Sequence, residues 1–454
     1  MGFVQGYASD SDSDSDSSSY SSAYLKHDIT ANSIQSNSLD SSEITDRKRK
    51  AKFTKADLKK KRQLRKAKGP WGNWSSDSNS TSDEHVGTNE LVGNDLAYVE
   101  ADEEELDIVE TSNFYGDSLK DYRGRSLLYP PVDVNIELQK SLLSFKCFLP
   151  KKQVYSFEGH KNGVTALEFL PKTSHLFLSG GNDDTIKIWD FYHDRKCIRD
   201  YIGHTKAIKA LDFDDDGKTF ISSSFDRYVK KWDTETGMIK NKTLVNGIPN
   251  DVKFRPFNPN EYIVGLSNSK INHYDDRVAS KQGLIQVYDH HQSSILNLRY
   301  FSDGSKFISS SEDKSIRIWE NQINIPIKQI SDTTQHSMPF INIHPQEHYF
   351  CTQSMDNTIY SYGMKPKYKR HPKKSFKGHN SAGYGIGITF SPDGKYICSG
   401  DSNSRIFIWD WTTARLLRSF DLPGNKPITQ VAWNLQETSK LLAAGGSGKI
   451  YLFD

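Results

Sequence analysis

The chain has 454 residues, of which 26% are charged and 35% hydrophobic, and its formal net charge is +2. No stretch approaches the ~18 uninterrupted apolar residues of a membrane-spanning helix, and the amino terminus lacks the apolar core of a secretory signal. We therefore expect no membrane partner. The four cysteines are too sparse for a disulfide scaffold and too far apart for a paired-cysteine zinc site, so we expect a reducing compartment.

Charge is distributed unevenly between two parts of the chain. Residues 1–150 carry 19 Lys and Arg against 25 Asp and Glu, whereas residues 151–454 carry 40 against 32. Residues 9–19 read SDSDSDSDSSS, which cannot bury a core and is either a solubilising tail or a kinase target. We expect 1–150 to be a long, mostly extended or disordered arm, and 151–454 to be the folded domain. A basic domain often has polyanionic partners.

A basic segment at 47–68 has 13 Lys or Arg among its 22 residues. Its two clusters have the pattern of a bipartite nuclear-localisation signal. The clusters lie at 47–52 and 59–68, and the candidate signal residues are Arg47, Lys48, Arg49 and Lys50, then Lys59, Lys60, Lys61 and Arg62. Contact with an RNA backbone and an inert solvated run are the alternatives. We expect the protein to be nuclear.

Two aromatic segments of the arm have no local core to enter. One is GPWGNW at 69–74, and the other spans 112–131 and ends in Pro130-Pro131. Exposed aromatic clusters usually mark docking segments. We therefore expect partner contacts from Trp71, Trp74, Phe114, Tyr115, Tyr122 and Arg123.

From residue 150 onward the chain repeats a pattern of Gly-His, two apolar strands and Asp-x-x-Ile-x-Ile-Trp-Asp. Seven copies follow one another at intervals of 42 to 47 residues, and they end at Trp189, Trp232, Tyr274, Trp319, Tyr362, Trp409 and Phe453. This period with these dipeptides is the WD-repeat signature. The sequence therefore predicts an all-β fold, a seven-bladed WD-repeat β-propeller.

Each strong repeat combines His, a small hydroxyl residue, Asp and Trp. The predicted sets are His160, Ser179, Asp183 and Trp189; His204, Ser222, Asp226 and Trp232; and His291, Ser309, Asp313 and Trp319. A buried carboxylate and imidazole are tolerable only when they are paired. Because the set recurs in several copies, it predicts structural hydrogen-bonded tetrads rather than a catalytic triad. We expect no enzyme activity.

Turn residues and the carboxyl end predict how the ring is built. Asp216-Gly217, Asp303-Gly304 and Asp393-Gly394 each separate two β-rich runs, as in tight hairpins. The chain stops after the third strand of its last repeat. We therefore expect residues 152–157, KQVYSF, to supply the missing strand and to close the propeller. The third, sixth and seventh repeats have Asn268, Asn403 and Ser447 in place of the tetrad Asp.

The longest interval contains a second basic run, KPKYKRHPKKSFK at 365–377. Pro366 and Pro372 predict an extended connection between two blades rather than a helix. A basic loop with aromatic residues suits an RNA backbone or an acidic protein surface, and a solvated charge run is the alternative. The candidate contact residues are Lys365, Lys367, Lys369, Arg370, Lys373 and Lys374.

Two other motifs are weaker. Tyr274-Asp275-Asp276-Arg277 is similar to a Trp-Asp-x-Arg sequence with which some WD proteins contact cullin-type ligase adaptors, but a plain strand end and turn is the preferred reading. Asp289-His290-His291 has no further ligands at metal spacing. We expect no metal, no cofactor and no small-molecule substrate.

Several segments resemble one family throughout most of the chain. They are GPWGNW at 69–74, FYGDSLKDYRGRSLLYPP at 114–131, LSGGNDDTIKIWDFYHDRKCIRDYIGH at 178–204, SSSFDRYVKKWDTETG at 222–237 and PKYKRHPKKSFKGH at 366–379. The chain resembles the pre-mRNA-processing factor seventeen family of WD-repeat splicing factors, in its fungal form. The segment at 114–131 and the YHD at 192–194 are the most specific.

This resemblance implies a nuclear, non-catalytic scaffold of the catalytic spliceosome that supports the second transesterification, in which the 3′ splice site is used and the exons are joined. Its partners would be spliceosomal core proteins and, through them or directly, snRNA and pre-mRNA, with no homo-oligomer. Two other classes stay open from the residues alone. One is a nuclear WD-repeat scaffold in ribosome biogenesis or chromatin, and the other is a substrate receptor of a cullin-type ubiquitin ligase.

Overall fold

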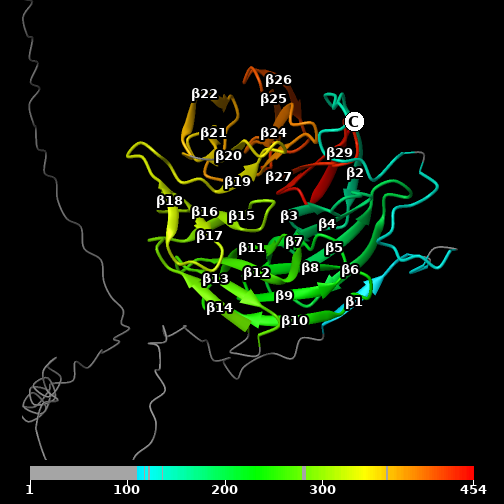
Figure 1. The fold of residues 1–454 in the computed structure, drawn as a ribbon. Coiled ribbons are helices and arrows are strands. Elements are labelled where there is room, and N and C mark those ends of the chain that lie inside the picture. The colour runs from blue at the N-terminus through cyan, green and yellow to red at the C-terminus, as the bar shows by residue number, and fades with distance from the viewer. Residues whose placement is uncertain (1–109, 117, 121–122, 135, 279–282, 365–366) are drawn as a thin grey trace, which may run out of the picture. The chain divides into compact units, whose positions relative to one another are not determined.

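The computed structural model describes residues 110–454 except 117, 121–122, 135, 279–282 and 365–366. The predicted arm up to residue 109 lies outside the described residues, and with it lie Trp71, Trp74 and both basic clusters of 47–68. The described chain forms seven antiparallel sheets around a central axis, which confirms the predicted seven-bladed propeller (Figure 1).

The first four blades follow the chain in order, each from its inner to its outer strand. Blade 1 has β3 (Val164–Phe169), β4 (Leu176–Gly181), β5 (Thr185–Asp190) and β6 (Cys197–Ile202). Blade 2 has β7 (Ile208–Phe213), β8 (Thr219–Ser224), β9 (Tyr228–Asp233) and β10 (Ile239–Leu244). Blade 3 has β11 (Pro249–Arg255), β12 (Asn258–Leu266), β13 (Ile271–Asp275) and β14 (Leu284–Tyr288). Blade 4 has β15 (Ile295–Tyr300), β16 (Lys306–Ser311), β17 (Ile316–Glu320) and β18 (Pro326–Ile330).

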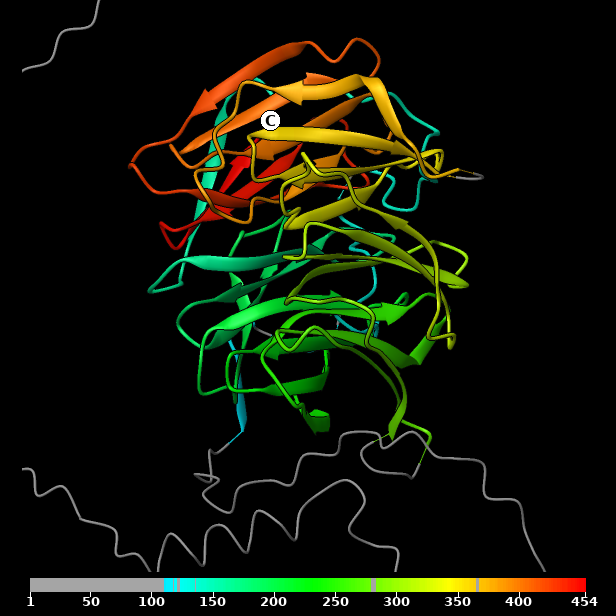
Figure 2. The same ribbon diagram turned by 90° about the vertical axis from the view of Figure 1, so that its left-hand side faces the viewer.

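The remaining three blades complete the ring, and Figure 2 shows the propeller from the side. Blade 5 has β19 (Phe340–Ile343), β20 (Tyr349–Ser354), β21 (Thr358–Gly363) and β22 (Arg370–Lys377). Blade 6 has β23 (Ile388–Phe390), β24 (Tyr396–Gly400), β25 (Arg405–Asp410) and β26 (Leu416–Asp421). Blade 7 has β27 (Ile428–Trp433), β28 (Leu441–Gly445), β29 (Lys449–Phe453) and β2 (Gln153–Glu158).

Blade 7 joins the two ends of the propeller. Strand β2 pairs with β29 in antiparallel register, with Gln153 opposite Phe453 and Phe157 opposite Ile450. The main-chain N–H groups of Lys151 and Lys152 also donate to the carbonyl of Asp454. This pairing confirms that the segment before the first repeat closes the ring.

The hydrophobic core lies between neighbouring blades. The second strands of blades 1 and 2, β4 and β8, are buried along their whole length, and β16 of blade 4 is buried except at Lys306. In blades 1, 2 and 4 the repeat Trp stacks on an aromatic ring of the second strand: Phe177 with Trp189, Phe220 with Trp232 and Phe307 with Trp319. Such contacts explain why the repeats combine β-branched and aromatic residues.

The three predicted Asp-Gly turns are present between the first two strands of blades 2, 4 and 6. Their glycines have φ values of 70°, 63° and 70° at Gly217, Gly304 and Gly394. This left-handed conformation favours glycine, although the corresponding turn of blade 5 has Glu347 at a φ of 55°.

Several described residues between 110 and 150, in the last part of the predicted arm, pack on the propeller. Strand β1 (Thr111–Phe114) adds a fifth strand to blade 1 by pairing with β6. Further along, the Leu127 carbonyl lies 3.1 Å from His175 Nε2, and the Lys140 main chain exchanges two hydrogen bonds with Gln436. Leu127, Leu128 and Cys147 also join the core clusters of the blades. The sequence did not predict these contacts, because a few apolar side chains in a mostly polar arm give no sign that they pack on a blade.

Candidate partner-binding site

The predicted tetrads form closed hydrogen-bond sets inside blades 1, 2 and 4. In blade 1, His160 Nδ1 lies 3.0 Å from Asp183 Oδ1, His160 Nε2 lies 2.7 Å from Ser179 Oγ, and Trp189 Nε1 donates to Ser179 Oγ at 2.8 Å. The other two sets have the same contacts. In blade 2, with His204, Ser222, Asp226 and Trp232, the His–Asp and His–Ser distances are both 2.7 Å and the Trp–Ser distance is 2.9 Å. In blade 4, with His291, Ser309, Asp313 and Trp319, the His–Asp, His–Ser and Trp–Ser distances are 2.8, 2.7 and 2.8 Å.

The electrostatics of these sets favour a structural role. Burial disfavours the charged form of Asp183 and Asp313, but hydrogen bonds and the paired imidazoles outweigh it, so the pKa of each carboxyl lies below its usual range. The side chains of His160 and His204 are each only 1% exposed. These imidazoles are closed to a substrate. Their hydrogen bonds instead hold the strands of a blade together.

Blade 6 departs from this arrangement although it keeps the Gly-His dipeptide. The His379 Nε2 atom lies 2.9 Å from Gln353 Oε1 on β20 of the neighbouring blade, and its Nδ1 atom has no hydrogen-bond partner among the described residues. Burial lowers the pKa of His379 to about 4. Asn403 in place of the tetrad Asp offers no carboxylate to this imidazole, so His379 links two blades in neutral form.

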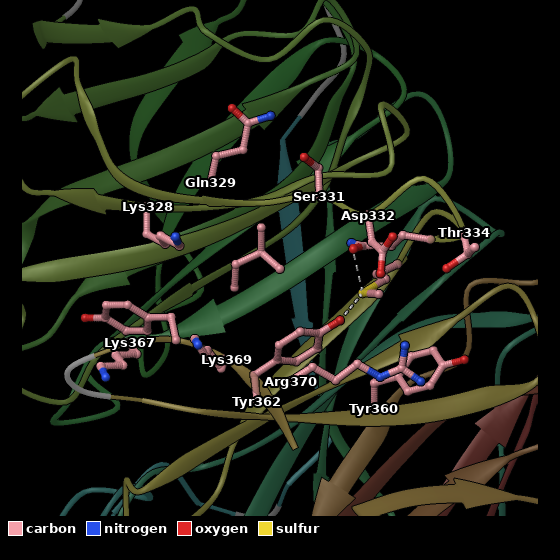
Figure 3. Close-up of a pocket in the computed structure, with 14 residues that line it drawn as sticks. Lys328, Gln329, Ser331, Asp332, Thr334, Tyr360, Tyr362, Lys367, Lys369 and Arg370 are labelled. Carbon is pink, nitrogen blue, oxygen red and sulfur yellow. Dashed lines mark hydrogen bonds between the residues drawn. The ribbon is translucent and has the colours of Figure 1, made fainter. Parts of the chain in front are cut away.

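The clearest candidate for a binding site is a pocket of about 650 Å³ between the outer strands of blades 4 and 5. We call it the blade 4–5 pocket (Figure 3). Its lining residues come from β18 and the segment after it, from β21, and from the start of the basic run. They include Lys328, Gln329, Ile330, Asp332, Met338, Tyr360, Tyr362, Lys367, Tyr368, Lys369 and Arg370.

Cations dominate the charge of this pocket. Lys328, Lys367, Lys369 and Arg370 are all exposed, and Asp332 is the one acidic residue among the lining side chains. The Arg370 guanidinium lies against the ring of Tyr360 (Figure 3), at 3.7 Å from the ring centre. The chain therefore gathers positive charge from two blades at one place, which suits an anionic partner.

The floor of the pocket is apolar and buried. Tyr362 and Tyr368 are only 2% and 6% exposed, and both pack in one core cluster with Met338. Burial raises the pKa of Tyr362 to about 12, so its hydroxyl is neutral. The pocket thus has a fixed neutral floor below a cationic rim.

The basic run differs in part from the predicted connection. From Arg370 to Lys377 it forms β22, the outer strand of blade 5, because its backbone pairs with β21. Lys373 on this strand is exposed. Lys374 is half-buried, and its Nζ atom lies 4.2 Å from the centre of a Trp411 ring, where burial lowers its pKa. Lys365 lies outside the described residues. Only Lys367, Lys369 and Arg370 of the predicted set line the pocket.

The docking residues that the structure describes lie beside blade 1. The Tyr115 hydroxyl donates to Asp200 Oδ2 at 2.9 Å, and the Arg199 guanidinium lies 5.0 Å from the centre of the Phe114 ring. Arg123 is exposed, and Tyr122 lies outside the described residues. Phe114 and Tyr115 therefore contact the chain's own propeller.

Sequence reasoning missed a polar cluster in the central channel, a cavity of about 720 Å³ lined by the inner strands. Lys253 Nζ and Asp212 Oδ1 form an ion pair of 2.6 Å there, and Asn297 donates to Asp251 at 2.7 Å. Burial raises the pKa of the Glu168 and Asp251 carboxyl groups. These residues alternate with apolar ones along separate strands, so only the ring brings them together.

The weaker motifs have plain structural surroundings. Arg277 of the Tyr274–Arg277 motif hydrogen bonds to Asp275 and Glu261 within blade 3. Within the described ranges, no group of three or more His, Cys, Asp or Glu could hold a metal ion. In the same ranges, no helix is long and apolar enough to span a membrane.

Comparisons with known proteins identify the family. The model of the WD domain, G-beta repeat, matches residues 151–190, 195–233, 282–320 and 370–410. The chain is 59% identical over 462 residues to Pre-mRNA-processing factor 17 of Saccharomyces cerevisiae, and the match covers 100% of both proteins. It is 38% identical over 354 residues to the proteins of that name from Mus musculus and Homo sapiens, and each match covers 78% of this chain and 60% of the relative. The chain therefore belongs to the pre-mRNA-processing factor 17 family, as a fungal member built on a non-catalytic WD-repeat propeller.

Proposed function

We propose that this protein is a nuclear splicing factor, a scaffold of the catalytic spliceosome that supports the second transesterification. The observation that carries the proposal is the 59% identity over the full chain to a yeast protein named for pre-mRNA processing. The same resemblance implies use of the 3′ splice site and exon ligation as the step that the protein supports. Spliceosomal core proteins, and snRNA and pre-mRNA through them or directly, are the proposed partners.

The propeller suits a scaffold because it offers a rigid frame with several separate surfaces. The Ser, His and Asp side chains of the repeats in blades 1, 2 and 4 are buried and hydrogen bonded to one another in the tetrads. The transesterification chemistry would therefore belong to the RNA and its metal ions. The blade 4–5 pocket supplies an exposed cationic surface on the blades. The basic segment at 47–68 would direct nuclear import or contact RNA.

The test is to purify the tagged full-length chain from splicing reactions that contain labelled pre-mRNA, and to identify the RNA that accompanies it. We expect snRNA together with the lariat intermediate and the free 5′ exon, which mark a spliceosome between the two steps. A chain that carries none of these RNAs but brings down pre-rRNA would support ribosome biogenesis and contradict the proposal. A cullin adaptor in place of snRNA would contradict it in favour of a ubiquitin ligase.

A further inference from the structure

Among the residues that the structure describes, no strand pairs with the outer edge of β18, the outer strand of blade 4. Ile325 just before it and Ile327 within it are 69% and 44% exposed, and Lys328 and Gln329 are exposed as well. An edge strand presents N–H and C=O groups that can pair with another extended chain. Natural edges are usually short, charged or covered, so an edge that carries exposed isoleucines needs an explanation.

The outer edge of blade 1 shows how this chain covers such an edge. Strand β1 pairs with β6 over four residues, and it is led by Glu110. The Glu110 carboxylate lies 2.5 Å from Lys230 Nζ and 4.0 Å from Lys242 Nζ. In blade 1, an extended segment next to an acidic residue therefore already adds to the outer strand of a blade.

The two ends of β18 differ in chemistry. Lys328, Gln329 and Ile330 line the blade 4–5 pocket, whereas Ile325 and Ile327 do not. The pairing of β18 with β17 shifts register between Lys328 and Pro326, so a bulge at Ile327 separates the two parts of the edge. Side chains of a strand that pairs with β18 would alternate between faces. Its acidic side chains would meet the pocket cations, and its apolar side chains would meet the exposed isoleucines.

The pocket itself favours an acidic peptide over RNA. Its exposed cations outnumber its one carboxylate, so an anionic chain is attracted in either case. Single-stranded RNA is usually held by aromatic faces on which bases stack. Here Tyr362 and Tyr368 are buried and Arg370 occupies the face of Tyr360. The backbone edge of β18 offers hydrogen bonds to a peptide main chain, and these need no aromatic face.

We propose that the outer edge of blade 4 and the blade 4–5 pocket bind an extended partner segment in which acidic residues alternate with apolar residues. The segment pairs with β18, directs its carboxylates to Lys328, Lys367, Lys369 and Arg370, and packs its apolar side chains on Ile325 and Ile327. This inference rests on the proposed scaffold function, because it names the chemistry of one partner that the scaffold would hold.

The experiment measures binding of a fluorescein-labelled decapeptide of alternating Glu and Val to the purified full-length chain by fluorescence anisotropy. A Lys-Val decapeptide and a ten-nucleotide oligouridylate are the comparison probes. The test variant carries Lys328→Glu, Lys367→Glu and Lys369→Glu. The matched control carries Lys161→Glu, Lys206→Glu and Lys314→Glu, three exposed lysines that do not line the pocket. A second variant, with Ile325→Ser and Ile327→Ser, leaves the charge unchanged.

We expect the Glu-Val peptide to bind more tightly than either comparison probe, with an affinity that falls as salt rises. The pocket variant should raise its Kd by about tenfold and flatten the salt dependence, whereas the control should change Kd less than about twofold. The isoleucine variant should weaken binding several-fold while the salt dependence persists. Circular dichroism melts of each variant show whether the propeller is intact.

Three results would overturn the proposal. They are tighter binding of the oligouridylate than of the Glu-Val peptide, equal losses in the pocket variant and its control, and unchanged binding in both the pocket and isoleucine variants. Because the assay uses the purified chain, such a result leaves the splicing role standing. Conversely, a failure of the splicing role would not alter peptide binding.

Discussion

Phe157 of β2 and Ile450 of β29 lie opposite each other in the strand pair that closes the propeller, although nearly the whole domain separates them in sequence. Phe157 is 1% exposed and packs against Phe177 and Trp189 of blade 1. The ends of the domain are therefore held both by backbone pairing and by aromatic packing on the next blade.

Removal of this packing should open the ring. We expect Phe157→Ala to lower the free energy of unfolding by about 3–5 kcal/mol, because it leaves a cavity beneath the closing strand. Val154 on the same strand is 43% exposed, so Val154→Ala should change stability by less than about 1 kcal/mol. Urea unfolding followed by tryptophan fluorescence measures both values. Equal stability of the two variants would show that β2 is not needed for closure.

The tetrad of blade 2 offers a matched pair of serines. Ser222 Oγ lies 2.7 Å from His204 Nε2 and accepts a hydrogen bond from Trp232 Nε1, whereas the buried Ser223 Oγ has no partner among the described residues. Ser222→Ala should cost about 1–3 kcal/mol because two buried ring nitrogens lose their partner. Ser223→Ala should cost less. Thermal melts of the two variants compare them, and a larger loss for Ser223→Ala would contradict the structural role of the tetrad.

The neutral, buried His379 predicts a fall in stability in mild acid. Burial lowers its pKa to about 4 in the folded state, below the ordinary value of 6.5, so the unfolded chain binds more protons between these values. The contribution of His379 to stability should therefore fall as pH drops below 6.5, by about 2 kcal/mol at pH 5. His273, whose pKa burial also lowers to about 4, adds to the acid sensitivity of the whole protein. The carboxyl groups of Asp183 and Asp313 have lowered pKa values, so their stabilisation is lost only below about pH 4.

Replacement of His379 isolates this effect. In His379→Gln, the loss of unfolding free energy between pH 6.5 and pH 5 should shrink, while His336→Gln, at an exposed position, should keep the full loss. Denaturant unfolding at several pH values gives the slope for each protein. An unchanged slope in His379→Gln would assign the acid sensitivity to another group.

The attachment of β1 to blade 1 should depend on Asp200. Its Oδ1 atom accepts from the Asn113 N–H at 3.1 Å, and its Oδ2 atom accepts from the Tyr115 hydroxyl at 2.9 Å. Asp200→Ala should speed amide hydrogen exchange of Thr111–Phe114 by about tenfold, which corresponds to the loss of about 1–2 kcal/mol. Asp194→Ala is the control, because Asp194 is exposed in the turn before β6. Mass spectrometry of peptides that cover β1 gives the rates, and equal rates in both variants would argue against this anchor.

The repeats made most of the fold predictable from sequence. Each copy of the pattern specifies strands and turns by its own residues, and the copies in blades 1, 2 and 4 also specify a tetrad, so the roles of Ser179, Ser222 and Ser309 could be predicted from sequence. The closing strand could also be predicted. The last repeat supplies only three strands, and the strand-like segment just before the first repeat can supply the fourth.

The binding surfaces were harder to predict because they depend on contacts between distant segments. Lys328 comes from blade 4 and Lys367 from blade 5, and only the angle between the blades gathers them around one pocket. Lys374 belonged to the same basic run, but strand pairing directed it toward Trp411 instead. The contact of Phe114 with Arg199 of the same chain was not predicted, because an aromatic residue in a polar arm gives no sign of which surface it contacts.

The most direct test of the proposed role is splicing of labelled pre-mRNA in extract depleted of this protein. The account predicts that the free 5′ exon and the lariat intermediate accumulate, and that later addition of the purified full-length chain converts them to ligated exons. If both steps proceed in depleted extract as they do before depletion, the protein is not a factor of the second step.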